Sequence, residues 1–226
     1  MIVVDVSGGS PSLRESKKLR TRAVLIDAAL ELCLKQGYQQ TTVEQIAASA
    51  YVSTRTFSRY FPTKDAVFLT LLDDYVLEVA DELEAVDAAV GPLEAMRQAH
   101  TGVLTRVATR RVGRLTTDRV VLMLRVINAS EVLKQAAVEF RHPRMQEVLA
   151  KRMGVDEDDP RARLVNVVFS ATIVDACGDL VSDTDTIRLG PLIVVARLNE
   201  ALAHVAWMAR DLQIPSADVD YEPVHG

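Results

Sequence analysis

The sequence predicts an all-α protein, and three observations lead to this prediction. Apolar residues recur at spacings of three and four, and Ile26, Ala29, Leu30 and Cys33 therefore share one face of a helix. Glycine and proline separate the amphipathic segments from one another. Segments that alternate apolar with polar residues and are rich in β-branched side chains are scarce, which argues against a sheet.

The expected elements follow in chain order. Residues 7–12 predict a flexible tether, and a first helix is expected over 17–36, ending at Gly37 because glycine adopts the left-handed conformation freely. Two short helices are expected within 42–61, and a long one over 64–86. The remaining helices are expected over 93–110, 115–128, 131–152, 161–181 and 191–211, separated by Gly113, the acidic loop 154–160, residues 182–186 and Gly190.

Proline adds detail to this series of helices. Pro92 and Pro191 suit the first turn of a helix, where the missing N–H would be unpaired in any case. Pro143 lies inside the element at 131–152 and is expected to split or kink it.

Charge is distributed unevenly along the 226 residues, whose net charge is -5. Residues 1–70 hold nine Lys or Arg and six Asp or Glu, a net of +3, and the remainder holds 17 basic and 25 acidic residues, a net of -8. The total argues against a nucleic-acid binder, whereas the asymmetry points to a basic module that contacts nucleic acid ahead of a larger acidic one.

Several classes of protein are excluded at this stage. The N-terminus has no basic region before a short apolar run, and no long uncharged apolar stretch is present, so we expect a cytoplasmic protein that does not enter the membrane. Two cysteines, Cys33 and Cys177, cannot form a disulfide framework, and buried structural roles are favoured over redox sensing. No nucleotide-binding, hydrolase or metal motif is found, so we expect no enzyme activity, cofactor or metal; the four histidines are His100, His142, His204 and His225.

Residues 41–61 are the most informative window. Thr42 and Gln45 form a capping box that begins one helix, and Ser53 can cap a second. A turn of about three residues centred on Tyr51 joins them, which predicts a helix-turn-helix. Periodicity alone also allows two short helices of a bundle with no nucleic-acid role.

The second short helix presents two different faces. With Phe57 pointing inward, Thr54, Tyr60 and Phe61 fall on the inner half, while Arg55 and Arg59 point outward. Arginine can grip guanine bidentately, and hydroxyls such as those of Thr56 and Ser58 can bind bases or phosphates. The expected DNA-binding residues, which include Lys64 at the start of the next helix, are Thr42, Ser53, Thr54, Arg55, Thr56, Ser58, Arg59, Tyr60 and Lys64.

The basic run before this window has two interpretations. One places the face that carries Arg14, Lys17 and Lys18 near phosphate or the minor groove, and the other makes it a solvated helix face.

The window resembles the DNA-binding domain of the TetR family of bacterial transcriptional regulators. The resemblance rests on residues 25–32, 37–38, 41–43, 46–47, 52–53, 56–57, 60–61 and 64–65. Tyr51 departs from the family's usual glycine, so either the turn has another shape or the side chain faces solvent or DNA. Ser58 replaces an aromatic that commonly touches the DNA backbone, and Cys33 replaces a frequent aromatic core residue.

The resemblance implies an arm at 1–13, a DNA-binding domain at 14–63 and a helical ligand-sensing and dimerisation domain at 64–226. It implies a homodimeric regulator, most often a repressor, that binds a palindromic double-stranded DNA operator and responds to a hydrophobic or acyl-CoA-like small molecule. Expected ligand contacts are Met96, Leu104, Met123, Ile127, Phe140, Phe169 and Ile173. Expected dimer contacts are Leu164, Val168, Ala171, Leu192, Val195, Leu198, Leu202 and Val205.

An arginine stripe stands out in the acidic part of the chain. Arg106, Arg110 and Arg114 follow one another at spacings of four, and they suit either an anionic ligand or pairing with acids of the preceding helix such as Glu78, Asp81 and Glu84. Of these two roles, pairing with acids of the preceding helix is favoured over binding of an anionic ligand.

Two functions of other kinds stay open. One is an all-helical enzyme or ligand carrier with a vestigial helix-turn-helix. The other is a DNA-binding activator or nucleoid-type protein without a small-molecule ligand.

Overall fold

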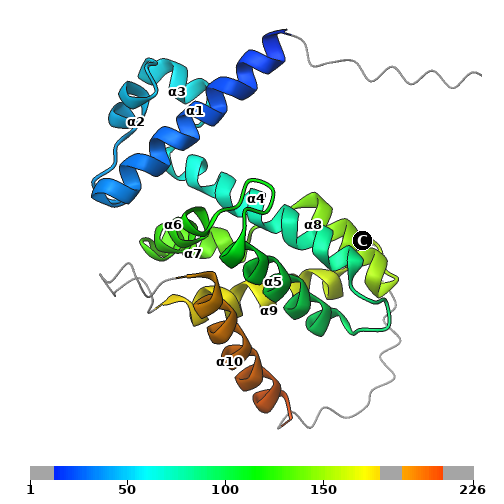
Figure 1. The fold of residues 1–226 in the computed structure, drawn as a ribbon. Coiled ribbons are helices and arrows are strands. Elements are labelled where there is room, and N and C mark those ends of the chain that lie inside the picture. The colour runs from blue at the N-terminus through cyan, green and yellow to red at the C-terminus, as the bar shows by residue number, and fades with distance from the viewer. Residues whose placement is uncertain (1–12, 179–189, 211–226) are drawn as a thin grey trace, which may run out of the picture.

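The computed structural model describes residues 13–178 and 190–210 (Figure 1). Helices make up most of this part of the chain, and its only strand-like pairing is one bridge between Val112 and Leu115. The all-α prediction is therefore confirmed. Residues 1–12 of the expected arm, the expected break at 182–186 and His225 lie outside the described residues.

Ten helices are found in the described ranges. The first four are α1 (Leu13–Gln36), α2 (Val43–Ser49), α3 (Thr54–Tyr60) and α4 (Lys64–Ala85). The next three are α5 (Pro92–Thr109), α6 (Thr117–Asn128) and α7 (Glu131–Val138). The last three are α8 (Pro143–Met153), α9 (Pro160–Ala176) and α10 (Pro191–Ala209).

Local chemistry explains most helix ends. Pro143 does split the element expected at 131–152, because it opens α8 as the first helical residue. Pro92 and Pro191 occupy the first turns of α5 and α10, as expected. Gly37 adopts a φ of 82° after α1, as its role as a helix stop predicts. The helix expected over 161–181 ends earlier, because α9 ends at Ala176 with Cys177 as its C-cap; residues 179–181 lie outside the described residues.

The helices form a small head and a larger body (Figure 1). In the head, α1 packs against α2, and α2 packs against α3. The long helix α4 leaves the head and runs into the body, where it packs against α5, α6 and α8. Thus α4 belongs to both parts and connects them mechanically.

One hydrophobic core continues from the head into the body. Leu25, Ile46 and Phe57 are almost fully buried in the head, and Leu83 and Phe169 are fully buried in the body. The two cysteines are also buried, in agreement with the structural role that was favoured for them.

The helix α10 is less well covered than the rest of the body. It packs against α5 and α9, and its second half projects from the bundle in Figure 1. By length and composition alone it is apolar enough to cross a membrane, but only 11% of its apolar window is buried. An apolar helix face is therefore left open in the single chain.

Candidate nucleic-acid interface and ligand cavity

The helix-turn-helix forms through the caps that the sequence predicts. The Thr42 hydroxyl accepts a hydrogen bond from the Gln45 amide at 3.3 Å, and the Gln45 side chain accepts one from the Thr42 amide at 3.0 Å. The Ser53 hydroxyl accepts a bond from the Thr56 amide at 3.1 Å and begins α3. These local bonds determine where both helices start.

Tyr51 occupies a strained position in the turn between α2 and α3. Its φ is 54°, which makes it the only non-glycine residue with a positive φ in the described ranges. Its amide donates to the Ala48 carbonyl at 3.0 Å, and its side chain is 96% exposed. The turn therefore keeps the left-handed shape that suits glycine, and the tyrosine side chain faces solvent.

Replacing Tyr51 with glycine should stabilise the protein by about 0.5–1 kcal/mol. Left-handed backbone disfavours a residue with a Cβ, and the exposed ring contributes little packing that could be lost. Urea denaturation would measure the change. Tyr51→Ala is the matched control, because it removes the ring and keeps the strain; equal stability of the two variants would contradict the strain argument.

The outer face of α3 is open to solvent. Phe57 is buried and anchors the helix, whereas Arg55, Ser58 and Arg59 are exposed. Thr54 was expected on the inner half of the helix, but it is exposed at the first turn, where α3 packs against little. Thr56 is half-buried, and its hydroxyl lies 3.0 Å from that of Ser53.

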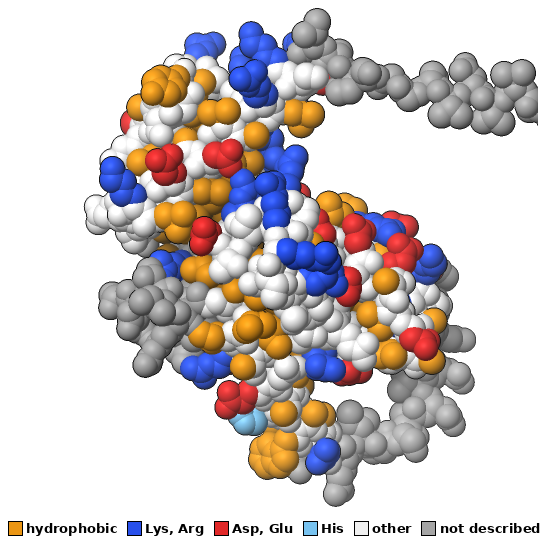
Figure 2. Space-filling view, viewed as in Figure 1, with side chains coloured by type: hydrophobic (Ala, Val, Ile, Leu, Met, Phe, Trp, Pro, Cys, Tyr) orange, Lys and Arg blue, Asp and Glu red, His pale blue; other side chains and the backbone are white. Residues whose placement is uncertain are grey.

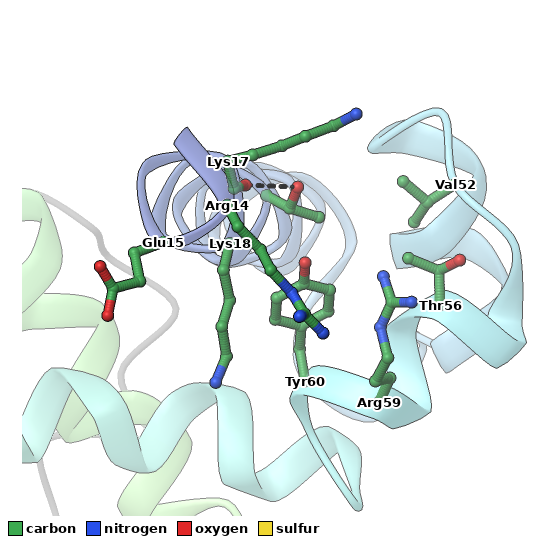
Figure 3. Close-up of a pocket in the computed structure, with 9 residues that line it drawn as sticks. Arg14, Glu15, Lys17, Lys18, Val52, Thr56, Arg59 and Tyr60 are labelled. Carbon is green, nitrogen blue, oxygen red and sulfur yellow. Dashed lines mark hydrogen bonds between the residues drawn. The ribbon is translucent and has the colours of Figure 1, made fainter. Parts of the chain in front are cut away.

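A basic groove of about 730 Å³ lies between the first half of α1 and the end of α3 (Figure 3). Arg14 from α1 and Arg59 from α3 extend toward each other across it. Glu15 is the only acid among the described residues that line the groove, and it points to the other side of α1. The remaining lining residues are Lys17, Lys18, Thr21, Val52, Thr56 and Tyr60.

The groove gathers four positively charged side chains, from Arg14, Lys17, Lys18 and Arg59. Facing cations repel one another, and a phosphate between them would remove that repulsion. The Arg59 guanidinium lies 5.3 Å from the centre of the Tyr60 ring, which holds it at the wall of the groove. Figure 2 shows Lys and Arg side chains gathered where α1 begins, at the top of the head. Of the two interpretations of the basic run, the one near phosphate is favoured.

The groove residues of α1 belong to the basic run for which both a face near phosphate and a solvated face were expected, and they are not among the individually expected DNA contacts. Arg14, Lys17 and Lys18 stand at spacings of three and four, which places them on one helical face. That spacing was the available signal. The packing of this face beside α3 depends on tertiary structure.

Lys64 requires a correction. It was expected to meet phosphate, but its ammonium donates to the Tyr38 and Thr41 carbonyls, both at 2.9 Å, and lies 4.0 Å from the centre of the Tyr38 ring. Asp65 accepts a hydrogen bond from the Tyr38 hydroxyl next to it. Lys64 therefore joins the start of α4 to the loop after α1, and two of its three protons are already donated within the head.

A small cavity of about 50 Å³ lies in the body among α4, α5, α6, α7 and α9. Four of the expected ligand contacts, Met123, Ile127, Phe140 and Ile173, line it. Met96, Leu104 and Phe169 do not, since each is packed into solid core. Ligand pockets usually measure about 300–1,000 Å³, so this cavity must expand to hold a drug-sized molecule.

A buried polar pair forms one wall of the cavity. The Tyr75 hydroxyl lies 2.8 Å from His100 Nδ1, and the His100 ring stacks on Phe169 with centroids 4.5 Å apart. Burial lowers the pKa of His100 to about 3 and raises the pKa of Tyr75. Both groups are therefore neutral at pH 7.

This shift predicts a loss of stability in acid. The unfolded chain takes up a proton on this histidine near pH 6.5, and the folded chain does so only near pH 3, so stability falls as pH drops between these values. The loss should approach about 1.4 kcal/mol per pH unit. Denaturation of wild type and His100→Gln from pH 7 to pH 4.5 would measure it. In His100→Gln, the dependence of stability on pH should correspond to about one fewer proton taken up on unfolding. A pH dependence equal to that of the wild type would contradict the buried, neutral state assigned to His100.

Comparison with known proteins identifies the family. A sequence profile described as "Bacterial regulatory proteins, tetR family" matches residues 25–71. The HTH-type transcriptional regulator TcmR of Streptomyces glaucescens is 38% identical over 183 residues, which cover 77% of this chain and 80% of TcmR. The chain belongs to the TetR family. It is therefore a DNA-binding transcriptional regulator and not an enzyme.

Other TetR-family relatives agree with this assignment. The HTH-type transcriptional regulator HbdR of Aromatoleum is 38% identical over 112 residues, which cover 45% of this chain and 49% of HbdR. The crystal structure of Thermus thermophilus FadR, a TetR-family repressor in complex with lauroyl-CoA, is 22% identical with a TM-score of 0.54. The match covers 86% of this chain and 98% of the FadR chain, and it confirms the fold.

The expected dimer contacts of this TetR-family chain lie in two environments. Leu164 and Leu192 are largely exposed, and Val168, Ala171, Val195, Leu202 and Val205 are partly so. Leu198 is a correction, because it is fully buried inside the single chain. Trp207 and Met208 were not expected, although both are more than half exposed beside a groove of about 590 Å³ between α9 and α10.

The arginine stripe is mostly paired with acids of α4. Arg106 donates to both carboxylate oxygens of Glu82 at 2.8 and 2.7 Å, and Arg114 lies 3.7 Å from Asp74. Arg110 is exposed at the end of α5. None of the three lines the body cavity. The expected pairing of the stripe with Asp81 and Glu84 is wrong, because these two acids pair with Arg144 of α8.

Proposed function

We propose that this TetR-family regulator is a homodimeric cytoplasmic repressor that releases a palindromic operator when a hydrophobic small molecule enters the body cavity. In this proposal residues 14–63 bind DNA, and residues 64–226 sense the ligand and dimerise. The basic groove between α1 and α3 carries the proposal, because it lies beside an exposed arginine face of the recognition helix.

The two outward arginines have different surroundings. Arg59 lies at the wall of the groove with the lysines of α1, which suits a backbone phosphate. Arg55 is exposed one turn earlier and does not line the groove. Its guanidinium is free to enter the major groove, where arginine pairs bidentately with guanine. We assign base reading to Arg55 and phosphate binding to Arg59.

A gel shift on the DNA upstream of the chain's own gene tests both assignments. Arg55→Ala should weaken operator binding by about 10–100-fold while leaving non-specific binding unchanged. Arg59→Ala should weaken both kinds of binding and lower the slope of affinity against salt by about one. Arg163→Ala, an exposed arginine of α9, is the control. Unchanged operator binding in the Arg55→Ala, Arg59→Ala double variant would refute the proposed DNA interface.

Two contacts connect the cavity to the DNA-binding head. The helix α6 supplies Met123 and Ile127 to the cavity. At its start, Arg119 binds Asp27 of α1 at 2.7 Å, and just past its end the Ala129 carbonyl accepts a bond from Gln39 at 3.1 Å. A ligand that expands the cavity therefore displaces α6 or α4 and, with it, the head. Ligand and operator then bind in opposition.

A further inference from the structure

The body cavity has an uncharged lining. Its wall in the described residues holds no Asp, Glu, Lys or Arg, and the apolar majority is Leu72, Val76, Met123, Leu124, Ile127, Ala137, Phe140, Ile173 and Val174. The polar minority is Tyr75, His100, Asn128, Asn166 and Ser170. A charged group that entered this cavity would lose its hydration and meet no countercharge, which is strongly unfavourable.

Most of the polar groups already have partners. Tyr75 and His100 bind each other, and the Asn166 amide donates to the Phe140 carbonyl at 3.3 Å. Because His100 stays neutral through burial, it offers no positive charge to a ligand. The polar side of the cavity is thus largely satisfied without a ligand.

Asn128 keeps one buried polar atom without a partner in the described residues. Its amide nitrogen donates to the Leu124 carbonyl at 3.0 Å, which leaves the Oδ1 atom as an acceptor. That oxygen is buried, and no hydrogen-bond partner for it is found in residues 13–178 and 190–210. A buried acceptor without a partner is costly and should be satisfied when a donor becomes available.

The nearby arginines do not change this chemistry. Arg106 is held bidentately by Glu82, and it lies outside the cavity wall. An acidic headgroup would have to break this pair or remain beyond the cavity.

We propose that the cavity binds an uncharged, mainly apolar aromatic molecule that carries one hydroxyl, and that this hydroxyl donates a hydrogen bond to Asn128 Oδ1. This inference rests on the proposed sensing role of the cavity and names its ligand class. Aromatic rings match the Phe140 and Tyr75 walls. Met123 is flexible and can yield as the cavity expands from about 50 Å³.

Three matched compounds test the proposal on the full-length protein. They are 2-naphthol, which is neutral and has a donor, 2-methoxynaphthalene, which is neutral and has none, and 2-naphthoate, which is charged. Calorimetry should show that 2-naphthol binds about tenfold more tightly than 2-methoxynaphthalene. Binding of 2-naphthoate should be weaker still. Lauroyl-CoA serves as the large anionic comparison.

Asn128→Leu removes the acceptor and retains the approximate volume of the side chain. The variant should bind 2-naphthol and 2-methoxynaphthalene equally, and it should melt at a higher temperature without ligand because the unpaired oxygen is gone. Asn199→Leu, an asparagine of α10 that does not line the cavity, should keep the tenfold preference. If Asn128→Leu does not fold, the preference of the wild-type protein for 2-naphthol over 2-methoxynaphthalene still tests whether the cavity selects a hydrogen-bond donor.

The outcomes separate this inference from the proposed function. Tighter binding of 2-naphthoate or lauroyl-CoA than of 2-naphthol, with operator release, would overturn the ligand class and leave the sensor intact. Binding of 2-naphthol with the expected preference but without operator release would uphold the ligand class and refute the sensor. Binding of none of the four compounds would overturn the inference, whatever the gel shift shows.

Discussion

Replacing Trp207 with glutamate is expected to convert the proposed dimer to a monomer and to lower operator affinity by roughly 10²–10⁴-fold. Trp207 is the single tryptophan of the chain and is 63% exposed on the projecting half of α10. A large aromatic side chain exposed beside an apolar groove is typical of the centre of a protein interface. In a dimer that covers this position, a glutamate carboxylate would lose its hydration, which is strongly unfavourable.

The loss of DNA binding follows from geometry. A recognition helix of seven residues, such as α3, makes few contacts, and strong binding requires two of them on one operator. A monomer keeps each half-site contact but loses the advantage of linking the two. Because Trp207 is far along the chain from the head, folding of α1–α3 should be unaffected.

Analytical ultracentrifugation and a gel shift would measure the two effects. Leu77→Glu is the control, because it places the same charge on an exposed leucine of α4. The control should stay dimeric and bind the operator. A Trp207→Glu protein that remains dimeric would contradict the interface proposed for α9 and α10.

Replacing Arg152 with alanine should cost about 3 kcal/mol of stability and lower Tm by roughly 6–12 °C. The guanidinium of Arg152 donates four hydrogen bonds to backbone carbonyls at the end of α4 and in the loop that follows. Its Nη1 binds Asp87 and Val90 at 2.9 and 3.1 Å. Its Nη2 binds Leu83 and Val86 at 3.0 and 2.6 Å.

One of these bonds reaches Leu83 in the last turn of α4 and three reach the loop that follows, so the guanidinium joins the helix end to the loop and places a cation at the negative end of the helix dipole. Arg152→Lys keeps the charge but cannot reproduce the fork of donors, so an intermediate loss is expected. Lys151→Ala, at the exposed neighbouring residue, should change Tm by less than about 2 °C. If Arg152→Ala also changes Tm by less than about 2 °C, the hydrogen bonds from the guanidinium to these carbonyls do not stabilise the fold as proposed.

The helix α4 contributes both to the stability of the fold and to the proposed coupling between the cavity and the head. Its end is held by Arg152 of α8, its middle lines the cavity through Leu72, Tyr75 and Val76, and its start is tied to the head by Lys64. A change of cavity volume therefore acts on a helix that is anchored at both ends. Because both ends of α4 are anchored, a small displacement of its middle should move the head and should not be absorbed in a loop.

The amino-acid sequence alone is enough to predict the features that depend on neighbouring residues. The capping box of Thr42 and Gln45, the cap at Ser53 and the helix start at Pro143 arise from hydrogen bonds and sterics within a few residues, and all three are found in the structure. The motif of α2 and α3 was specific enough to indicate the family, which comparison with TcmR confirmed.

Which side of each helix meets core, solvent or a partner side chain became visible in the folded chain. Lys64 turns inward, Leu198 belongs to the core of the single chain, and Arg106 pairs with Glu82, although periodicity allowed each to face a partner or a ligand. An apolar or charged residue on a helix has the same local pattern whether it meets core, ligand or solvent. The distinction depends on packing between helices far apart in the chain, which residue spacing alone does not encode.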